Sequence, residues 1–160
     1  MISGLLSAQT EKPYDPTLDG QKQIKDAVAQ AKLDGKHVFM MIGGNWWVWC
    51  LRFHKYVNEN ETIDSLLKAD YVFVLLNYSR ENKNLDILAE LDYPQRFGFP
   101  VFVVLDADGN RIHTQNSAYL EKDKSYDEMK VIQFFKHWSP AALNPKSYKW
   151  RIKTIQPPRW

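Results

Sequence analysis

Three short runs of consecutive apolar residues constrain the fold of this chain more than any other feature. They span residues 38–42, 71–76 and 101–105, and they contain only aliphatic side chains, aromatic side chains and methionine. A run of this length without polar alternation is typical of a β-strand that is buried on both faces of its sheet. Because both faces must be covered, we expect helices on either side of the sheet.

The segments before, between and after these runs carry the spacing of amphipathic helices. In the first segment apolar residues recur every three or four positions, Asp19 is a good N-cap and Gly35 supplies a stop, so a helix is expected to about Leu33. Similar patterns predict helices over residues 47–57, 61–67, 85–91 and 125–138. The last of these is expected to begin at Ser125 and to use Met129, Ile132, Phe135 and Trp138 as its apolar face.

The predicted order of elements is α β α β α β β α. Strands separated by helices predict parallel pairing with right-handed crossovers. The Asp-Gly pair within residues 106–110 predicts a tight turn, so residues 111–114 should return as an antiparallel strand. The predicted fold class is α/β, a central mixed sheet with helices on both faces. Residues 1–17 are expected to form an extended leader, residues 18–140 the domain, and residues 141–160 a basic, aromatic tail packed on it.

Two stretches of the sequence resemble the thioredoxin superfamily. Gly43-Gly44-Asn45-Trp46 lies where exported thioredoxin-like and thiol-disulfide isomerase-like proteins carry the residues that lead into a Cys-x-x-Cys motif. Residues 96–109, with the sequence Arg-Phe-Gly-Phe-Pro-Val-Phe-Val-Val-Leu-Asp-Ala-Asp-Gly, are similar to the loop, strand and hairpin that follow that motif in the family. The resemblance extends over residues 19–138 and implies a thioredoxin-like three-layer sandwich.

The dithiol site that the resemblance implies has lost its first cysteine. The motif position holds Trp47-Val48-Trp49-Cys50, and Cys50 is the single cysteine of the chain. In the family the first thiol lies at a helix N-terminus, which lowers its pKa. An indole at Trp47 cannot act as that nucleophile, and Met41 stands where thioredoxin has a buried carboxylate. Cys50 is expected to lie a turn inside the helix, buried and unreactive.

Aromatic residues remain around the lost dithiol. The resemblance implies that Pro100 is cis and lies beside the helix start, with the Phe99 backbone offering an edge to an extended peptide. Trp46, Trp47, Trp49 and Phe99 are expected to gather there, with Tyr93 as a possible neighbour; the alternative is that Trp46 and one other tryptophan pack into the body. The leading hypothesis is a redox-inactive module that binds a peptide or protein partner at this surface. The alternative is a monothiol thiol-disulfide oxidoreductase or isomerase, with Cys50 as its catalytic residue.

A second chemical hypothesis concerns Cys50 and His54, which lie four residues apart and so share one face of a helix. Such a pair can form an activated nucleophile or supply two metal ligands. No second cysteine and no further histidine at matching spacing completes a metal site. The sequence therefore predicts no metal and no cofactor, and the coincidence of two residues on one helix face is the favoured interpretation.

The charged residues are distributed unevenly. All 19 acidic residues lie at or before Glu128, and residues 129–160 carry seven of the 21 basic ones, so residues 1–128 have a net charge of −5. The basic tail, in which Tyr148, Trp150 and Ile152 alternate with basic residues, is expected to be extended and to dock on the acidic body. The alternative is contact with an anionic surface, and a nucleic-acid partner is not favoured.

The first nine residues carry a weak export signal. Met1–Gln9 ends in small residues, as a secretory signal does, but lacks the basic start and most of the apolar core. We expect a periplasmic or otherwise exported protein, with a cytoplasmic location as the alternative. No run approaches the roughly 18 apolar residues of a spanning helix, so no membrane span is expected. The sequence carries no signal for an oligomeric state.

Overall fold

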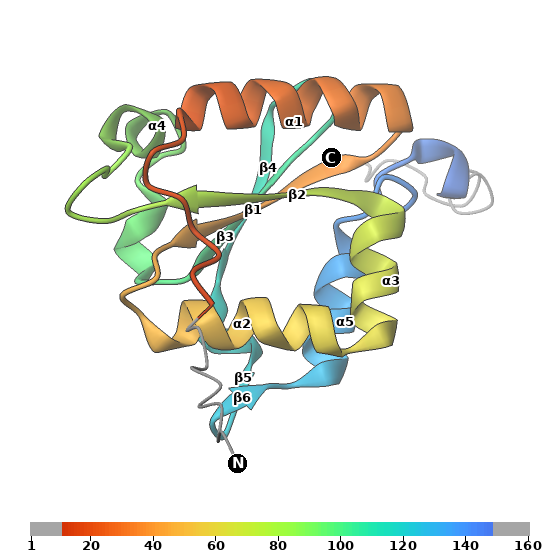
Figure 1. Ribbon diagram of the computed structural model, residues 1–160. Helices are drawn as coiled ribbons and strands as arrows, with labels where there is room; N and C mark the ends of the chain where they lie inside the picture. Colours follow the sequence, from red (N-terminus) through yellow and green to blue (C-terminus); the bar gives the residue numbers. More distant parts are fainter. Residues whose placement is uncertain (1–10, 149–160) are drawn as a thin grey trace, which may run out of the picture.

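Four strands form one mixed sheet in the order β2-β1-β3-β4. The computed structural model describes residues 11–148 of the chain (Figure 1). The strands are β1 (His37–Gly43), β2 (Tyr71–Asn77), β3 (Val101–Leu105) and β4 (Arg111–Asn116). β1 pairs in parallel with β2 and antiparallel with β3, and β3 pairs antiparallel with β4. The three apolar runs are therefore the three adjoining strands of the sheet.

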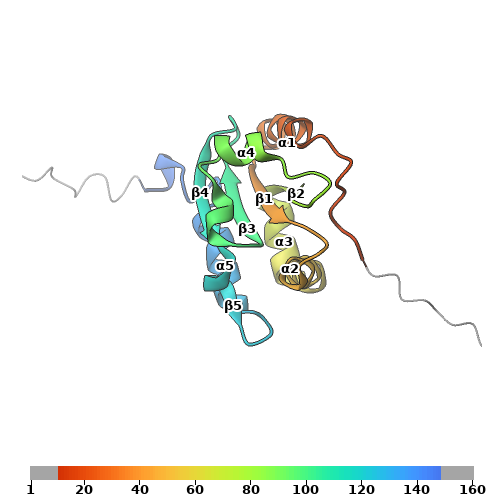
Figure 2. The ribbon, with the colours of Figure 1, turned by 90° about the vertical axis from the view of Figure 1, so that its left-hand side faces the viewer.

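Helices cover both faces of the sheet, which confirms the predicted three-layer α/β fold (Figure 1, Figure 2). One layer holds α1 (Gly20–Asp34) and α4 (Leu85–Glu90). The other layer holds α2 (Val48–Glu59), α3 (Glu61–Asp70) and α5 (Glu128–His137). None of the described helices has the length and hydropathy that a membrane span requires.

Each apolar strand supplies side chains to two separate cores. On the side of α2, α3 and α5 the core is aromatic: the Phe39 ring lies 5.3 Å from that of Phe102 and 5.1 Å from that of Phe135. On the side of α1 and α4 the core is aliphatic and includes Val38 and Met40. Because successive strand residues point to opposite faces, an unbroken apolar run is what two cores require.

The ends of α1 follow local rules that the sequence predicted. The Asp19 side chain accepts a hydrogen bond from the Lys22 N–H at 3.1 Å, and Gly35 ends the helix in the left-handed conformation with φ of 67°. The first helical residue, Gly20, lies against the Leu76 and Ile87 side chains, and a Cβ there would come within 2.8 Å of both. The N-terminus of α1 is therefore docked closely on the body.

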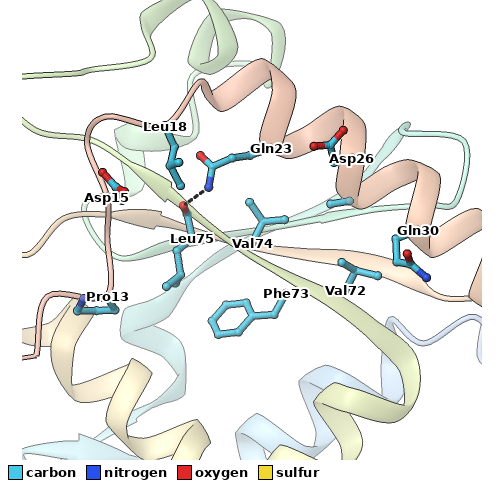
Figure 3. A pocket seen from close by; sticks show the side chains of 11 residues that line it. Pro13, Asp15, Leu18, Gln23, Asp26, Gln30, Val72, Phe73, Val74 and Leu75 are labelled. Carbon is cyan, nitrogen blue, oxygen red and sulfur yellow. Dashed lines mark hydrogen bonds between the residues drawn. The ribbon is translucent and has the colours of Figure 1, made fainter.

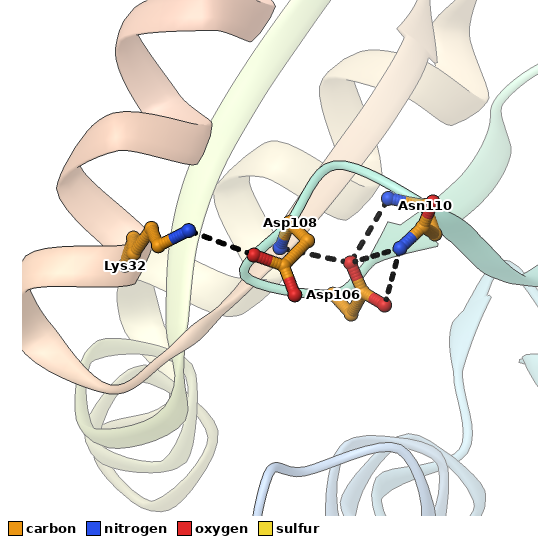
Figure 4. A network of polar contacts seen from close by, with 4 residues as sticks. All are labelled: Lys32, Asp106, Asp108 and Asn110. Atoms are coloured by element: carbon orange, nitrogen blue, oxygen red, sulfur yellow. Dashed lines mark hydrogen bonds and ion pairs between the residues drawn. The ribbon is translucent and has the colours of Figure 1, made fainter.

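The turn between β3 and β4 is also as predicted. One carboxylate oxygen of Asp106 accepts hydrogen bonds from the N–H groups of Asp108 and Asn110, both at 2.9 Å (Figure 4). Gly109 takes a positive φ of 85°, which is accessible to glycine without a steric penalty. Lys32 of α1 forms an ion pair with Asp108 at 2.9 Å and ties this turn to the helix layer.

The pairing of β3 differs from the prediction, because β3 runs antiparallel to β1. A parallel crossover would have to carry the chain back along the whole sheet. The connection between β2 and β3 contains only the six-residue α4 and a 3₁₀ turn at Pro94–Phe97. Six helical residues span about 9 Å, whereas seven strand residues span about 23 Å. Residues 78–100 turn back on themselves instead of crossing the sheet, so the chain re-enters the sheet at the end where β2 finished.

The last helix begins later than predicted. The caps at Ser125 and Asp127 compete, and Asp127 caps α5 by accepting a hydrogen bond from the Lys130 N–H at 3.1 Å. Ser125–Tyr126 instead forms β6, which pairs with β5 (Glu121–Lys122) in a small hairpin that was not predicted. The apolar face shifts accordingly, because Met129 is exposed and Val131 is buried.

The chain before α1 lies on the body without forming a helix or a strand. This N-terminal strap, residues 11–18, passes the end of β2 on its way from α2 to α1 (Figure 1). Beside it, a groove of about 530 Å³ follows the outer edge of β2, where the Gln23 side chain donates to the Leu75 carbonyl at 3.3 Å (Figure 3). Residues 141–148, the described part of the predicted tail, are not extended: they turn into a short 3₁₀ helix, η3 (Pro145–Tyr148), which has no buried residue. The predicted leader residues 1–10 and tail residues 149–160 lie outside the described residues.

Candidate functional site

The candidate site lies at the N-terminus of α2. Trp47 is the N-cap residue, with φ of −118° and ψ of 120°, and its side chain makes no capping hydrogen bond. Its carbonyl accepts a hydrogen bond from the N–H of Cys50 at 3.0 Å, which is the first hydrogen bond of the helix. Trp46 is 53% exposed and Trp47 is 40% exposed. Two large, partly exposed apolar side chains thus lie beside the free N–H groups at the N-terminus of α2.

Trp46 is fixed by the residues around it. Its indole N–H donates to the Tyr78 carbonyl at 2.6 Å, and its ring lies edge-on to that of Phe99 at 5.6 Å. A Cβ at Gly44 would overlap the indole nitrogen, so glycine at this position makes room for the ring. The ring of Trp47 lies 6.0 Å from that of Trp46 and has no such polar anchor. Trp46 is therefore anchored by a hydrogen bond, whereas Trp47 is placed by packing alone.

The segment before β3 forms the opposite side of the site. Phe99 is half-buried and stacks on Tyr78, with the ring centroids 4.7 Å apart. The Phe99–Pro100 peptide bond is cis, and Pro100 is buried. Among the described residues, the Phe99 backbone N–H and C=O have no hydrogen-bond partner. They are available to an extended chain laid beside them.

Between these two sides runs a groove of about 380 Å³. We call it the aromatic groove, and its lining comprises Trp46, Trp47, Trp49, Phe97, Gly98, Phe99, Asn116, Ser117, Ala118 and Glu121. Trp49 lies edge-on to Tyr126 at 5.7 Å and beneath the Arg52 guanidinium at 4.7 Å. The structure thus brings together the tryptophans and Phe99, whereas Tyr93 is exposed and lies outside the lining.

Cys50 is completely buried on the inner side of α2. A Cβ at Gly43 would overlap the Cys50 sulfur and lie 3.0 Å from the hydroxyl oxygen of Tyr14, so both groups crowd onto this glycine. Burial raises the pKa of the Cys50 thiol to about 11, and the Gly44 N–H and the nearby Tyr14 hydroxyl oppose that rise only in part. A thiol in this state is a poor nucleophile near neutral pH.

His54 does not join Cys50 in a common site. Its ring contacts the Asn58 side chain at 3.2 Å and lies 4.0 Å from the Glu11 carboxylate, whereas Cys50 faces Gly43. Burial lowers the pKa of His54. Within residues 11–148, no three His, Cys, Asp or Glu side chains are grouped so that they could hold a metal ion.

Sequence reasoning missed three residues of this region. Tyr78 and Phe97 belong to the aromatic groove and its support, and both adjoin motifs that the sequence marked, the end of β2 and the Gly-Phe-Pro loop. Tyr14 is 1% exposed and packs beside Cys50, although it lies in a proline-containing segment without periodicity. No local pattern indicated that a leader residue would enter the core.

The buried thiol predicts a loss of stability at alkaline pH. The folded pKa is raised to about 11, whereas an unfolded cysteine titrates near 8.5. Between these values the unfolded chain loses a proton that the folded chain retains, so the free energy of unfolding falls as pH rises. From about pH 8 to about pH 10, urea denaturation should show the wild type losing about 2 kcal/mol more than Cys50→Ala. Equal losses in the two proteins would contradict a sealed, protonated thiol.

Comparison with solved structures shows the same architecture in other proteins. The chain is similar to a disulphide isomerase from Xylella fastidiosa Temecula1, with a TM-score of 0.70 and 25% identity over 79% of this chain and 95% of that one. It is also similar in fold to DsbH oxidoreductase, with a TM-score of 0.51, 17% identity and coverage of 70% and 81%. A thioredoxin from Thermus thermophilus matches with a TM-score of 0.51, 16% identity and coverage of 71% and 81%.

Comparison with family models and with curated sequences completes the assignment. No curated protein sequence gave a significant match. A family model described as Thioredoxin-like matches residues 19–107, which is more than half of the chain and includes α2, the cis-proline and β3. Together with the three-layer sandwich and the helix that begins after β1, this match identifies the chain as a member of the thioredoxin-like family.

Proposed function

We propose that this protein is a redox-inactive member of the thioredoxin-like family that binds an extended peptide segment of a partner protein in the aromatic groove. One observation carries the proposal. Trp47 occupies the exposed N-cap of α2, where the family's first cysteine would lie, and Cys50, the only sulfur of a dithiol motif, is completely buried. Disulfide exchange needs an accessible thiolate and a second thiol to resolve the mixed disulfide. This chain has neither.

The geometry of the groove supports peptide binding. Tryptophan is among the side chains that contribute most to protein interfaces, because it buries a large area at low entropic cost. Trp46 is preorganised by its bond to the Tyr78 carbonyl, and Trp47 offers a partly exposed ring beside it. The unpaired backbone groups of Phe99 can bond to an extended chain as a strand edge does. A groove that combines apolar side chains with the unpaired backbone groups of Phe99 favours an extended, partly apolar peptide.

A second candidate is a monothiol oxidoreductase or isomerase acting through Cys50. Its support is the similarity to a protein named as a disulphide isomerase, together with the retention of one cysteine. Against it stand the raised pKa and complete burial of that thiol. Titration of Cys50 with a small alkylating reagent separates the two: a pKa well below about 8.5 with fast labelling would favour the enzyme.

Export is part of the proposal for this protein. Its support is the small-residue segment within Met1–Gln9, and the partner would then be an exported or periplasmic protein. We also propose that the basic tail, residues 141–160, docks on the acidic body of the same chain.

Reduction of insulin disulfides by dithiothreitol tests the proposed lack of redox activity. The purified wild type is expected to give the same rate as Cys50→Ala, because a buried thiol without a resolving partner cannot turn over. Both should match the rate of dithiothreitol alone. Turnover by the wild type above the Cys50→Ala rate would overturn the redox-inactive proposal and favour the monothiol enzyme.

A further inference from the structure

The contact between the N-terminal strap and Cys50 has no part in the peptide-binding proposal. Tyr14 is the only strap residue that is fully buried, and its ring belongs to the same core as Cys50 and Phe53. Its hydroxyl is buried beside the thiol but makes no aligned hydrogen bond to any described residue. Apart from the neighbouring Cys50 thiol, packing in the aromatic core is therefore what holds the Tyr14 side chain in its place.

Besides the buried Tyr14 ring, the strap is held to the body by few hydrogen bonds. The backbone of Tyr14 exchanges two hydrogen bonds with the Asn45 side chain, at 3.0 Å and 2.7 Å. The Asn82 side chain donates to the carbonyls of Pro16 and Leu18, at 3.2 Å and 3.3 Å. The strap forms no ladder with the sheet, and α1 begins with the closely docked Gly20. The strap can therefore leave the body without moving α1, with its hinge before Gly20.

Removal of Tyr14 would connect Cys50 to solvent. Tyr14 also lines an open groove of about 630 Å³, together with Lys12, Asn45, Asn77 and Glu81. The same side chain therefore contacts this groove and also lies beside the buried thiol, next to Gly43. The strap residues Lys12, Tyr14, Asp15 and Pro16 form one wall of the groove, so when the strap lifts the sulfur is opened to solvent and regains the ordinary reactivity of a cysteine.

We propose that Cys50 is a gated thiol-modification site, which the N-terminal strap seals through Tyr14 and which low-molecular-weight disulfides and other soft electrophiles reach when the strap lifts. In the open state the Cys50 thiolate attacks one sulfur of the disulfide. The old S–S bond breaks as a new one forms to Cys50, and the second sulfur leaves as a thiolate that takes a proton from water. The strap cannot close over the enlarged side chain, so modification would hold the protein open.

The test measures the labelling rate of Cys50 at increasing urea, with iodoacetamide as the neutral electrophile and 2-hydroxyethyl disulfide as the disulfide. The wild type should react slowly, at a rate nearly independent of urea below the unfolding transition, because lifting the strap exposes little surface. Tyr14→Ala is expected to react about 100-fold faster, since it loses the buried anchor. Asn45→Ala removes the two strap bonds without opening the core and should react about 10-fold faster.

Leu88→Ala is the matched control, because Leu88 is buried in the core on the opposite face of the sheet. It should lower the stability of the body and leave the labelling rate at low urea unchanged. Equal acceleration by Leu88→Ala, or a wild-type rate that climbs steeply with urea, would show that only global unfolding exposes the thiol. Unchanged rates in both Tyr14→Ala and Asn45→Ala would show that the strap is not the seal. Either result overturns the gated site and leaves the peptide-binding proposal untouched.

Discussion

Replacing Trp47 with cysteine should convert this protein into a dithiol reductant. Trp47→Cys would place a thiol at the N-cap of α2, where the helix dipole and unpaired N–H groups lower a thiol pKa. Cys50, one helical turn further, would then act as the resolving thiol. We expect the insulin reduction rate to rise at least about 100-fold over the wild type, because thiolate would form at neutral pH instead of near pH 11.

Two variants control for the chemistry of that experiment. Trp47→Ser removes the same indole without adding a thiol, and Trp47→Cys combined with Cys50→Ala supplies the first thiol without the resolving one. Both are expected to remain near the wild-type rate, the second after forming mixed disulfides that it cannot release. If folded Trp47→Cys were as inactive as Trp47→Ser, position 47 would not be the place of the lost nucleophile.

Removing the Trp47 side chain should abolish most peptide affinity while leaving the fold intact. The probe is a set of peptides selected on the wild-type protein from a random 12-residue phage library. Trp47→Ala is expected to raise their Kd by about 30-fold or more, which corresponds to about 2 kcal/mol for a central interface tryptophan. Because Trp47 is 40% exposed and makes no capping bond, the free energy of unfolding should change by less than about 1 kcal/mol.

Leu33→Ala is the matched control for surface hydrophobicity. Leu33 is 82% exposed on α1 and lies outside the aromatic groove, so its removal should leave the Kd unchanged. Peptides that bind Trp47→Ala as tightly as the wild type would place their site elsewhere. A library that yields no binders to the wild type would argue against a peptide ligand altogether.

The layers of the fold could be predicted because each rests on a local signal. The Asp19 cap and the Gly35 stop bound α1, and the Asp106–Asn110 turn returns the chain into β4. Strand direction could not be predicted in this way. It depends on whether the connection from β2 to β3 crosses the sheet or turns back, and residues 78–100 are long enough for either course. Likewise Ser125 and Asp127 are both good caps, and only the burial of Tyr126 assigns the first to a strand.

The candidate site was predictable where the chain is continuous and unpredictable where distant segments meet. Trp47 and Cys50 follow β1 directly, so their places at the helix start and inside it follow from helical spacing. The contact of Tyr14 with Cys50 joins residues that are 36 positions apart through an irregular segment. Neither periodicity nor turn chemistry specifies such a contact. The contact depends on the space that Gly43, which has no side chain, leaves for the Cys50 sulfur and the Tyr14 hydroxyl.

The indole N–H signals of the ¹⁵N-labelled wild type, recorded while a selected peptide is added, test the central claim most directly. Six tryptophans give six such signals. Peptide binding in the aromatic groove predicts that the signals of Trp46, Trp47 and Trp49 move together with the backbone amide of Phe99, while that of Trp138 stays in place. Shifts confined to the groove beside β2, with the three tryptophan signals unmoved, would contradict the account.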